Sequence, residues 1–143
     1  MFSKEESKKL REEFWIAFGK SFPRKWILYH TKIKDLSFKF HFDTKKALVV
    51  LDVEPQALEQ RMELWEKLLS LKSILLGDYL PDAIFEDYFV LDNQKEISRI
   101  YVERNNVSIH NKNTWQETME FLNRNMILFE AFFEEYKDIL RRD

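Results

Sequence analysis

Apolar residues near the end of the chain recur at alternating spacings of four and three, which is typical of a helix with one apolar stripe. The stripe consists of Trp115, Met119, Leu122, Met126, Phe129, Phe133, Tyr136 and Leu140. A second set of apolar residues widens it on one flank: Phe121, Leu128, Phe132 and Ile139. Thr114 and Glu117 have the spacing of a capping box, so we expect a helix that opens at Thr114, runs to about Leu140 and covers a sheet. The wide flank predicts association, and we expect a homodimer through this C-terminal helix.

The start of the chain predicts another helix. Ser3 and Glu6 form a second capping box, and Pro23 prevents continuation of a helix beyond it. The apolar face between these two points recurs every four residues: Leu10, Phe14, Phe18 and Phe22. We therefore expect a helix over residues 4–22.

A third helix is predicted in the middle of the chain. Pro55 suits a first helical turn, and Gly77 is a typical stop. The apolar stripe between them is Leu58, Met62, Trp65 and Leu69, widened by Leu64, Leu68, Leu71 and Leu75. These features predict one helix over residues 55–76.

Two hairpins are predicted between the helices. Residues 36–42 alternate apolar and polar side chains, as in a strand with one buried face, and residues 47–53 are apolar on both faces, as in an interior strand. Residues 84–91 and 97–103 predict a second hairpin around a polar loop. A short further strand is expected at residues 107–110.

The predicted order is therefore helix, hairpin, helix, hairpin, helix. It favours a single α+β domain over residues 1–143, with an antiparallel or mixed sheet covered by three helices. A chain of this length buries roughly 70% of its unfolded surface, so it needs no covalent staples.

Composition excludes several classes of function. The chain has no cysteine, which excludes thiol catalysis and cysteine-ligated zinc and fits a reducing compartment. No apolar run reaches the roughly 20 residues of a membrane span, and the start lacks the apolar core of a signal peptide, so we expect a cytoplasmic protein without membrane contact. With only Gly19 and Gly77 available, a glycine-rich phosphate loop cannot be built. The histidines lie far apart, and we expect neither a metal nor a cofactor.

The net charge of −2 conceals a basic segment. Residues 20–46 hold eight Lys or Arg against two Asp, a local charge of +6 that leaves −8 for the remainder. Lys39 and His41 share one face of the predicted strand 36–42, and Lys46 follows in the turn. These three residues are candidates for nucleic-acid contact, because lysines bind phosphates. The alternative is a solvated face that protects the strand from edge pairing.

Two aromatic residues, Trp26 and Tyr29, precede that strand together with Lys32 and Lys34. Exposed aromatic rings beside lysines can stack on unpaired bases while the lysines hold the phosphates. The alternative is that both rings cover the end of the sheet.

Arg99 and Tyr101 share one face of the predicted strand 97–103. An arginine in this setting either anchors an anionic ligand or forms a structural ion pair with an acidic residue. Both residues are candidates for ligand or nucleic-acid binding.

Asp52 and Glu54, at the exit of the strand 47–53, are the candidates for an alternative, catalytic interpretation. A metal-dependent nuclease of the PD-(D/E)xK type needs two acidic groups and a lysine around a metal ion. No lysine follows Asp52 and Glu54 at the required spacing. Acid-x-lysine elements at residues 43–45 and 135–137 are explained by turn chemistry and by helix surface charge.

Three motifs carry a family resemblance: Glu13-Phe14-Trp15 with Phe18-Gly19, Ser98-Arg99-Ile100-Tyr101, and Val107-Ser108-Ile109 leading to Asn111-Lys112 and Trp115. In these motifs, and over nearly its full length, the chain resembles a small bacterial family classed as a domain of unknown function. The resemblance implies a stand-alone protein or a module C-terminal to PD-(D/E)xK nuclease-like domains, and by analogy a link to nucleic-acid transactions or defence. It implies no catalytic residue. The matching positions that could face a ligand are Trp15, Arg99, Tyr101, Asn111 and Trp115.

These observations favour a non-enzymatic binding or interaction module that acts on a protein or nucleic-acid partner. The alternative is a nucleic-acid-binding protein or a degenerate metal-dependent nuclease-like enzyme that uses Asp52 or Glu54.

Overall fold

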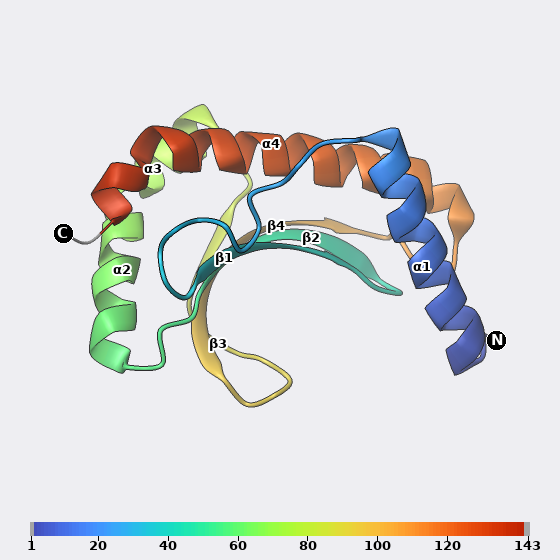
Figure 1. Cartoon of the computed structure of the whole chain (residues 1–143), viewed down its shortest axis with the longest axis horizontal. Helices are drawn as coiled ribbons and strands as arrows, with labels where there is room; N and C mark the ends of the chain where they lie inside the picture. The colour runs from blue at the N-terminus through green and yellow to red at the C-terminus, as the bar shows by residue number, and fades with distance from the viewer. Residues whose placement is uncertain (1, 142–143) are drawn as a thin grey trace.

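Four helices and four strands make up the chain, as a computed structural model of residues 2–141 shows (Figure 1). In chain order they are α1 (Lys4–Ser21), β1 (Leu36–Phe42), β2 (Lys46–Val53), α2 (Leu58–Ser70), α3 (Lys72–Asp78), β3 (Ile84–Val90), β4 (Glu96–Asn105), the short 3-10 helix η1 (Lys112–Thr114) and α4 (Trp115–Leu140).

The four strands form one antiparallel sheet in the order β1-β2-β4-β3. The two hairpins therefore lie side by side, with β2 and β4 in the centre. Alternation along the strands sends Ala47, Val49, Leu51 and Val53 of β2 into the core. The predicted α+β class is confirmed, and the sheet is antiparallel.

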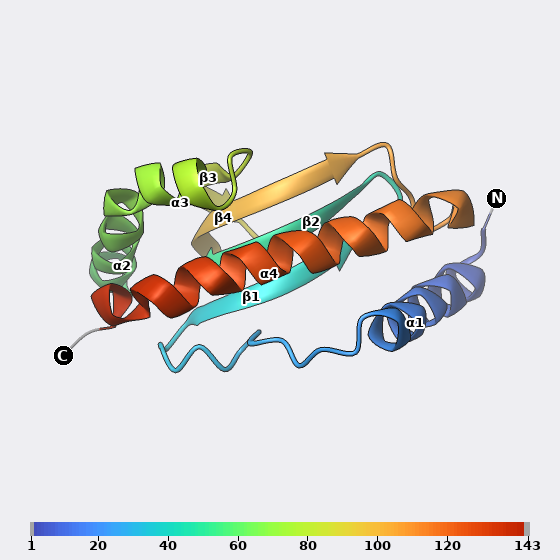
Figure 2. The same cartoon turned by 90° about the horizontal axis from the view of Figure 1, so that it is seen from above.

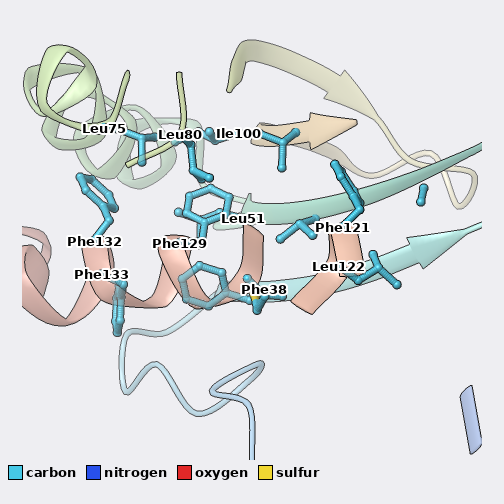
Figure 3. Close-up of a cluster of buried hydrophobic side chains, with 14 of the residues drawn as sticks. Phe38, Leu51, Leu75, Leu80, Ile100, Phe121, Leu122, Phe129, Phe132 and Phe133 are labelled. Atoms are coloured by element: carbon cyan, nitrogen blue, oxygen red, sulfur yellow. The ribbon is translucent and has the colours of Figure 1, made fainter. Parts of the chain in front are cut away.

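Helix α4 lies lengthwise across one face of the sheet (Figure 2). Its stripe of apolar residues supplies the largest part of the core, and Figure 3 shows the rings of Phe129 and Phe133 close to Phe38 of β1, with centroids 5.4 and 5.6 Å from the Phe38 ring. All three residues are almost completely buried. Each such side chain contributes about 1.5–3 kcal/mol by leaving water.

Helices α1 and α2–α3 pack at opposite ends of the sheet (Figures 1 and 2). The capping box at the start of α1 is confirmed: Glu6 N donates to Ser3 Oγ and Ser3 N donates to Glu6 Oε1, both at 3.1 Å. The bond that the Ser3 amide donates lowers the pKa of Glu6.

The single helix predicted over residues 55–76 is wrong in its bounds. Helix α2 begins at Leu58, and the chain leaves helical geometry at Leu71, whose φ of −101° and ψ of 3° separate α2 from α3. The side chain of Leu71 is buried, so packing against the core overrides the local preference for one continuous helix. Gly77 lies inside α3 and does not stop it.

The predicted capping box at Thr114 is also wrong. The Thr114 hydroxyl donates to the carbonyls of Ser108 and Asn111, and it makes no cap bond to α4. Glu117 forms an ion pair with Arg104 instead. The short strand predicted at 107–110 is a turn, although the Ile109 amide donates to Asp43 O.

The flank of α4 is not the free surface that the sequence predicts. Phe121 and Phe132 are buried, and the Phe132 ring lies 5.6 Å from that of Tyr79, just after α3. Leu128 is half-buried, which leaves Ile139 as the exposed residue of the set, at 50%. The homodimer stays an untested prediction of the sequence, and the small exposed area of this flank argues against it.

None of the helices within residues 2–141 has the length and apolar character that a membrane crossing requires.

Candidate binding cleft on the open face of the sheet

Within residues 2–141, no helix covers the face of the sheet opposite α4 (Figure 1). This face carries a cleft of about 570 Å³. Leu48 and Val50 of β2 form its apolar floor, and Phe89, Val90 and Leu91 of the β3–β4 hairpin form a wall. Figure 1 shows this hairpin extending away from the sheet on the side opposite α4. The remaining lining residues are polar or aromatic: Lys39, Phe40, His41, Asp43, Lys46, Glu86, Asp92, Arg99 and Tyr101.

Strand register places these side chains in rows across the sheet. One row pairs Ser37 with Asp52, Asp52 with Arg99, and Arg99 with Glu86. The next row pairs Lys39 with Val50, Val50 with Tyr101, and Tyr101 with Ile84. Because directly opposite residues on antiparallel strands have Cβ atoms about 5 Å apart, residues that are distant in sequence become neighbours here.

Asp52 is the centre of an ion-pair network beside the cleft. Its side chain is completely buried, and Arg99 donates to it through Nε at 2.7 Å and Nη2 at 3.0 Å. Lys39 Nζ donates to Oδ2 of the same carboxylate at 2.9 Å. Both carboxylate oxygens of Asp52 are therefore engaged in charge-assisted hydrogen bonds.

Glu54 extends the network at the end of β2. It accepts a hydrogen bond from Lys39 Nζ at 3.3 Å and one from the Ser37 hydroxyl at 3.4 Å. Burial alone would lower the pKa of Lys39, but the hydrogen bond to Asp52 and the charges of Asp52 and Glu54 outweigh it and raise that pKa above its usual value. Lys39 is therefore held as a cation.

A bulge in β3 places an aromatic ring over Arg99. The pairing of β3 with β4 shifts between Glu86 and Phe89, and the Arg99 guanidinium carbon lies 4.2 Å from the centre of the Phe89 ring. The bulge is fixed at Asp87, whose carbonyl accepts the Ser98 hydroxyl at 2.6 Å and whose carboxylate accepts Trp65 Nε1 at 2.7 Å. This arrangement leaves 12% of the Arg99 side chain exposed.

Tyr101 stands beside the network, and its hydroxyl donates to Glu86 Oε1 at 2.8 Å. Burial and this hydrogen bond raise the pKa of Tyr101 to about 12. The phenol is therefore a neutral hydrogen-bonding group at physiological pH.

The rim of the cleft holds two further pairs. His41 Nε2 lies 2.7 Å from Asp43 Oδ2, and Lys46 Nζ lies 4.0 Å from Glu103 Oε2. Burial would raise the pKa of Asp43, but the hydrogen bonds from His41 and from the amides of Lys45 and Lys46 lower it overall.

All five predicted binding residues line this one cleft: Lys39, His41, Lys46, Arg99 and Tyr101. Asp52 and Glu54 do not line it and are paired with its cations. Among residues 2–141, no group of three or more His, Asp or Glu side chains could hold a metal ion.

Comparison with protein families gives a match over residues 10–137 to the family described as a domain of unknown function (DUF4268). The chain belongs to this family. The resemblance found in its sequence motifs is thereby confirmed, whereas an association with nuclease-like domains stays a prediction. Neither the comparison with curated proteins nor that with solved structures gives a match.

The positions of this DUF4268 domain that the resemblance implied as ligand-facing divide into two groups. Arg99 and Tyr101 line the cleft. Trp115 is buried and donates through Nε1 to Ile109 O, Trp15 packs against Phe14, Phe18 and Phe40, and Asn111 caps η1.

Sequence reasoning missed the cleft's apolar part. Leu48 and Val50 belong to a strand that is apolar on both faces, so nothing in the pattern marks one face as open. Phe89 was not predicted as a cleft residue, because the bulge in β3 reverses the alternation of side chains between the two faces of the sheet.

The cleft of this DUF4268 domain is acidic once its ion pairs are counted. Its three cations, Lys39, Lys46 and Arg99, are each paired with a carboxylate that does not line it: Asp52, Glu54 or Glu103. Three more carboxylates, from Asp43, Glu86 and Asp92, do line it. Three cations against six carboxylates give a net charge of −3 with His41 neutral.

Proposed function

We propose that this domain is a non-enzymatic binding module whose cleft on the open face of the sheet receives a segment of a partner protein. The convergence of Lys39, Arg99 and Tyr101 on an apolar floor formed by Leu48 and Val50 carries the proposal. Binding sites commonly combine apolar surface with polar groups held in fixed positions, and about 570 Å³ lies within the common size range of such sites.

The state of Asp52 favours binding over catalysis. A general base or metal ligand needs a carboxylate oxygen that can reach a substrate or an ion. Both oxygens of Asp52 accept hydrogen bonds from Arg99, Lys39 also donates to one of them, and the side chain is completely buried. Asp52 therefore orients the two cations.

The charge of the cleft favours a protein segment over nucleic acid at this site. A phosphate backbone would meet a surface with a net charge of −3, whereas lysine or arginine side chains would be attracted to Glu86, Asp92 and Asp43. Apolar side chains of the same segment would cover Leu48, Val50 and Phe89. The partner segment is accordingly apolar and positively charged.

Display selection of random peptides tests this function. We expect the wild-type domain to enrich peptides that the variant Val90→Trp does not bind, since a tryptophan at this exposed cleft residue fills the site. The matched control is Tyr88→Trp, which alters an exposed position of the same strand outside the cleft.

Enriched peptides that bind Tyr88→Trp like the wild type, and Val90→Trp at least tenfold more weakly, would support the proposal. Peptides that bind Val90→Trp as well as the wild type would contradict it. Cleavage of DNA or RNA by the domain with magnesium, abolished in Asp52→Ala, would contradict its non-enzymatic part.

A further inference from the structure

The loop that joins α1 to β1 holds an unusual backbone conformation. Three of its residues lie in the left-handed region without being glycine: Leu28 at φ 45°, Lys32 at φ 63° and Asp35 at φ 61°. Side chains rarely adopt this region, and such strained residues persist only where the surrounding structure holds them.

Buried polar groups hold the loop in this shape. Glu130 of α4, 4% exposed, accepts the amide of Ile27 at 2.7 Å and Arg24 Nη2 at 3.1 Å. Thr31, 1% exposed, donates its hydroxyl to Leu36 O at 2.8 Å. A further bond from Phe38 N to Leu28 O ties the loop to the edge of β1. The loop is therefore a preorganised part of the surface.

Its outward side is aromatic and basic. Tyr29 is 71% exposed, whereas the Trp26 ring packs against Phe40 and is therefore not free to stack on a ligand. Residues 24–35 hold four Lys or Arg against one Asp, and Glu130 balances Arg24, so the loop keeps a charge of +2. Within the described part of the chain, no ion pair neutralises the exposed Lys25, Lys32 or Lys34.

A depression lies next to these residues. It measures about 330 Å³, and its lining includes Tyr29, Lys32 and Lys34. Two acidic residues also line it: Asp35, and Glu54, which is already paired with Lys39. A ring and lysines beside a depression can accommodate one base and its flanking phosphates.

We propose that residues 24–35 form a site for single-stranded nucleic acid, in which Tyr29 stacks on one base and Lys32 and Lys34 hold the adjacent phosphates. Stacking on an exposed ring requires an unpaired base, which selects a single strand over a duplex. The site lies outside the acidic cleft and does not depend on the function proposed for that cleft.

Fluorescence anisotropy with a labelled oligothymidylate tests this site across a salt series. Tyr29→Ala should weaken binding about tenfold, the effect of losing one stacked base, and Tyr29→Phe should restore it. Lys32→Ala combined with Lys34→Ala should reduce the slope of log affinity against log salt by about 1.4, since each phosphate contact on a single strand contributes about 0.7. Circular dichroism checks that each variant folds.

The matched control is Lys8→Ala combined with Lys9→Ala, which removes the same charge from exposed positions on α1. Unchanged binding by this control, together with weaker binding of a duplex of equal length, would support the site. The proposal is overturned if the oligonucleotide does not bind at low salt, if the control weakens binding as much as the loop variants, or if Tyr29→Ala binds like the wild type. Preference for polyglutamate over the oligonucleotide would also overturn it.

Discussion

Arg99 donates two hydrogen bonds to the buried carboxylate of Asp52 on the neighbouring strand, through Nε at 2.7 Å and Nη2 at 3.0 Å. The bond joins two residues that are 47 positions apart in sequence. It fixes the guanidinium of Arg99 at the cleft. It also occupies both oxygens of the Asp52 carboxylate, which a metal site would need as ligands.

Removing this carboxylate should destabilise the fold. Asp52→Ala leaves Arg99 and Lys39 as cations without their central partner, and breaking a buried ion pair on one side costs about 3–5 kcal/mol. We expect the free energy of unfolding, measured by urea denaturation, to fall by that amount. Lys45→Ala, in an exposed turn, should change it by about 0.5 kcal/mol or less.

Replacing both partners provides a second test of the pair. Asp52→Leu combined with Arg99→Met removes the charge together with its partner and should recover most of the loss, because apolar replacements need no desolvation of ions. A double variant that is less stable than Asp52→Ala would contradict the role given to this pair.

Tyr101 should make stability fall at alkaline pH. An unfolded tyrosine loses its proton near pH 10, whereas burial and the hydrogen bond to Glu86 raise the pKa of folded Tyr101 to about 12. The folded state therefore binds more protons between these values, so the contribution of Tyr101 is complete below about pH 10 and is lost as the pH rises to about 12.

Ultraviolet absorbance of tyrosinate measures this titration directly. We expect a late phase near pH 12 that Tyr101→Phe removes and that Glu86→Gln moves to lower pH. An identical titration curve for the wild type and Tyr101→Phe would contradict the assignment.

The strained loop predicts a conflict between stability and binding. Lys32 has a φ of 63°, so Lys32→Gly should raise the free energy of unfolding by up to about 1 kcal/mol through relief of left-handed strain. Lys34→Gly, at a residue outside the left-handed region, should lower it by about 0.5–1 kcal/mol. Urea denaturation separates the two, and equal changes would show that Lys32 is not strained. Both variants should bind an oligonucleotide more weakly.

Association through α4 is testable at Ile139. With Phe121 and Phe132 buried, the flank offers far less than the roughly 800 Å² per partner of a stable interface. We expect the chain to sediment as a 17.5 kDa monomer, and Ile139→Glu to sediment identically. A wild-type dimer that Ile139→Glu dissociates would contradict this expectation.

Local periodicity was enough to predict most of the fold. The period-two alternation of residues 36–42 and the capping box at Ser3 depend on near neighbours in sequence, and both are confirmed. The break at Leu71 was mispredicted because packing against the core overrides local preference there. The cap at Thr114 was mispredicted because its hydroxyl bonds to the preceding turn, at Ser108 and Asn111.

For the candidate site, the sequence predicts which side chains share a face of one strand, but not which residues of other strands they contact. Alternation placed Lys39 and His41 on one face of β1, and Arg99 and Tyr101 on one face of β4. Only strand register brings the two faces together, and only the bulge brings Phe89 onto Arg99. Long-range pairing of this kind leaves no periodic trace in the sequence.

The most direct test of the binding cleft is a titration of the ¹⁵N-labelled domain with a synthetic peptide of alternating lysine and valine, followed by amide chemical shifts. We predict the largest shifts at Leu48, Val50 and Tyr101, and smaller ones with a matched glutamate–valine peptide. Shifts confined to α1 and α2, or no shift with any peptide, would contradict the claim that the open face of the sheet is the binding site.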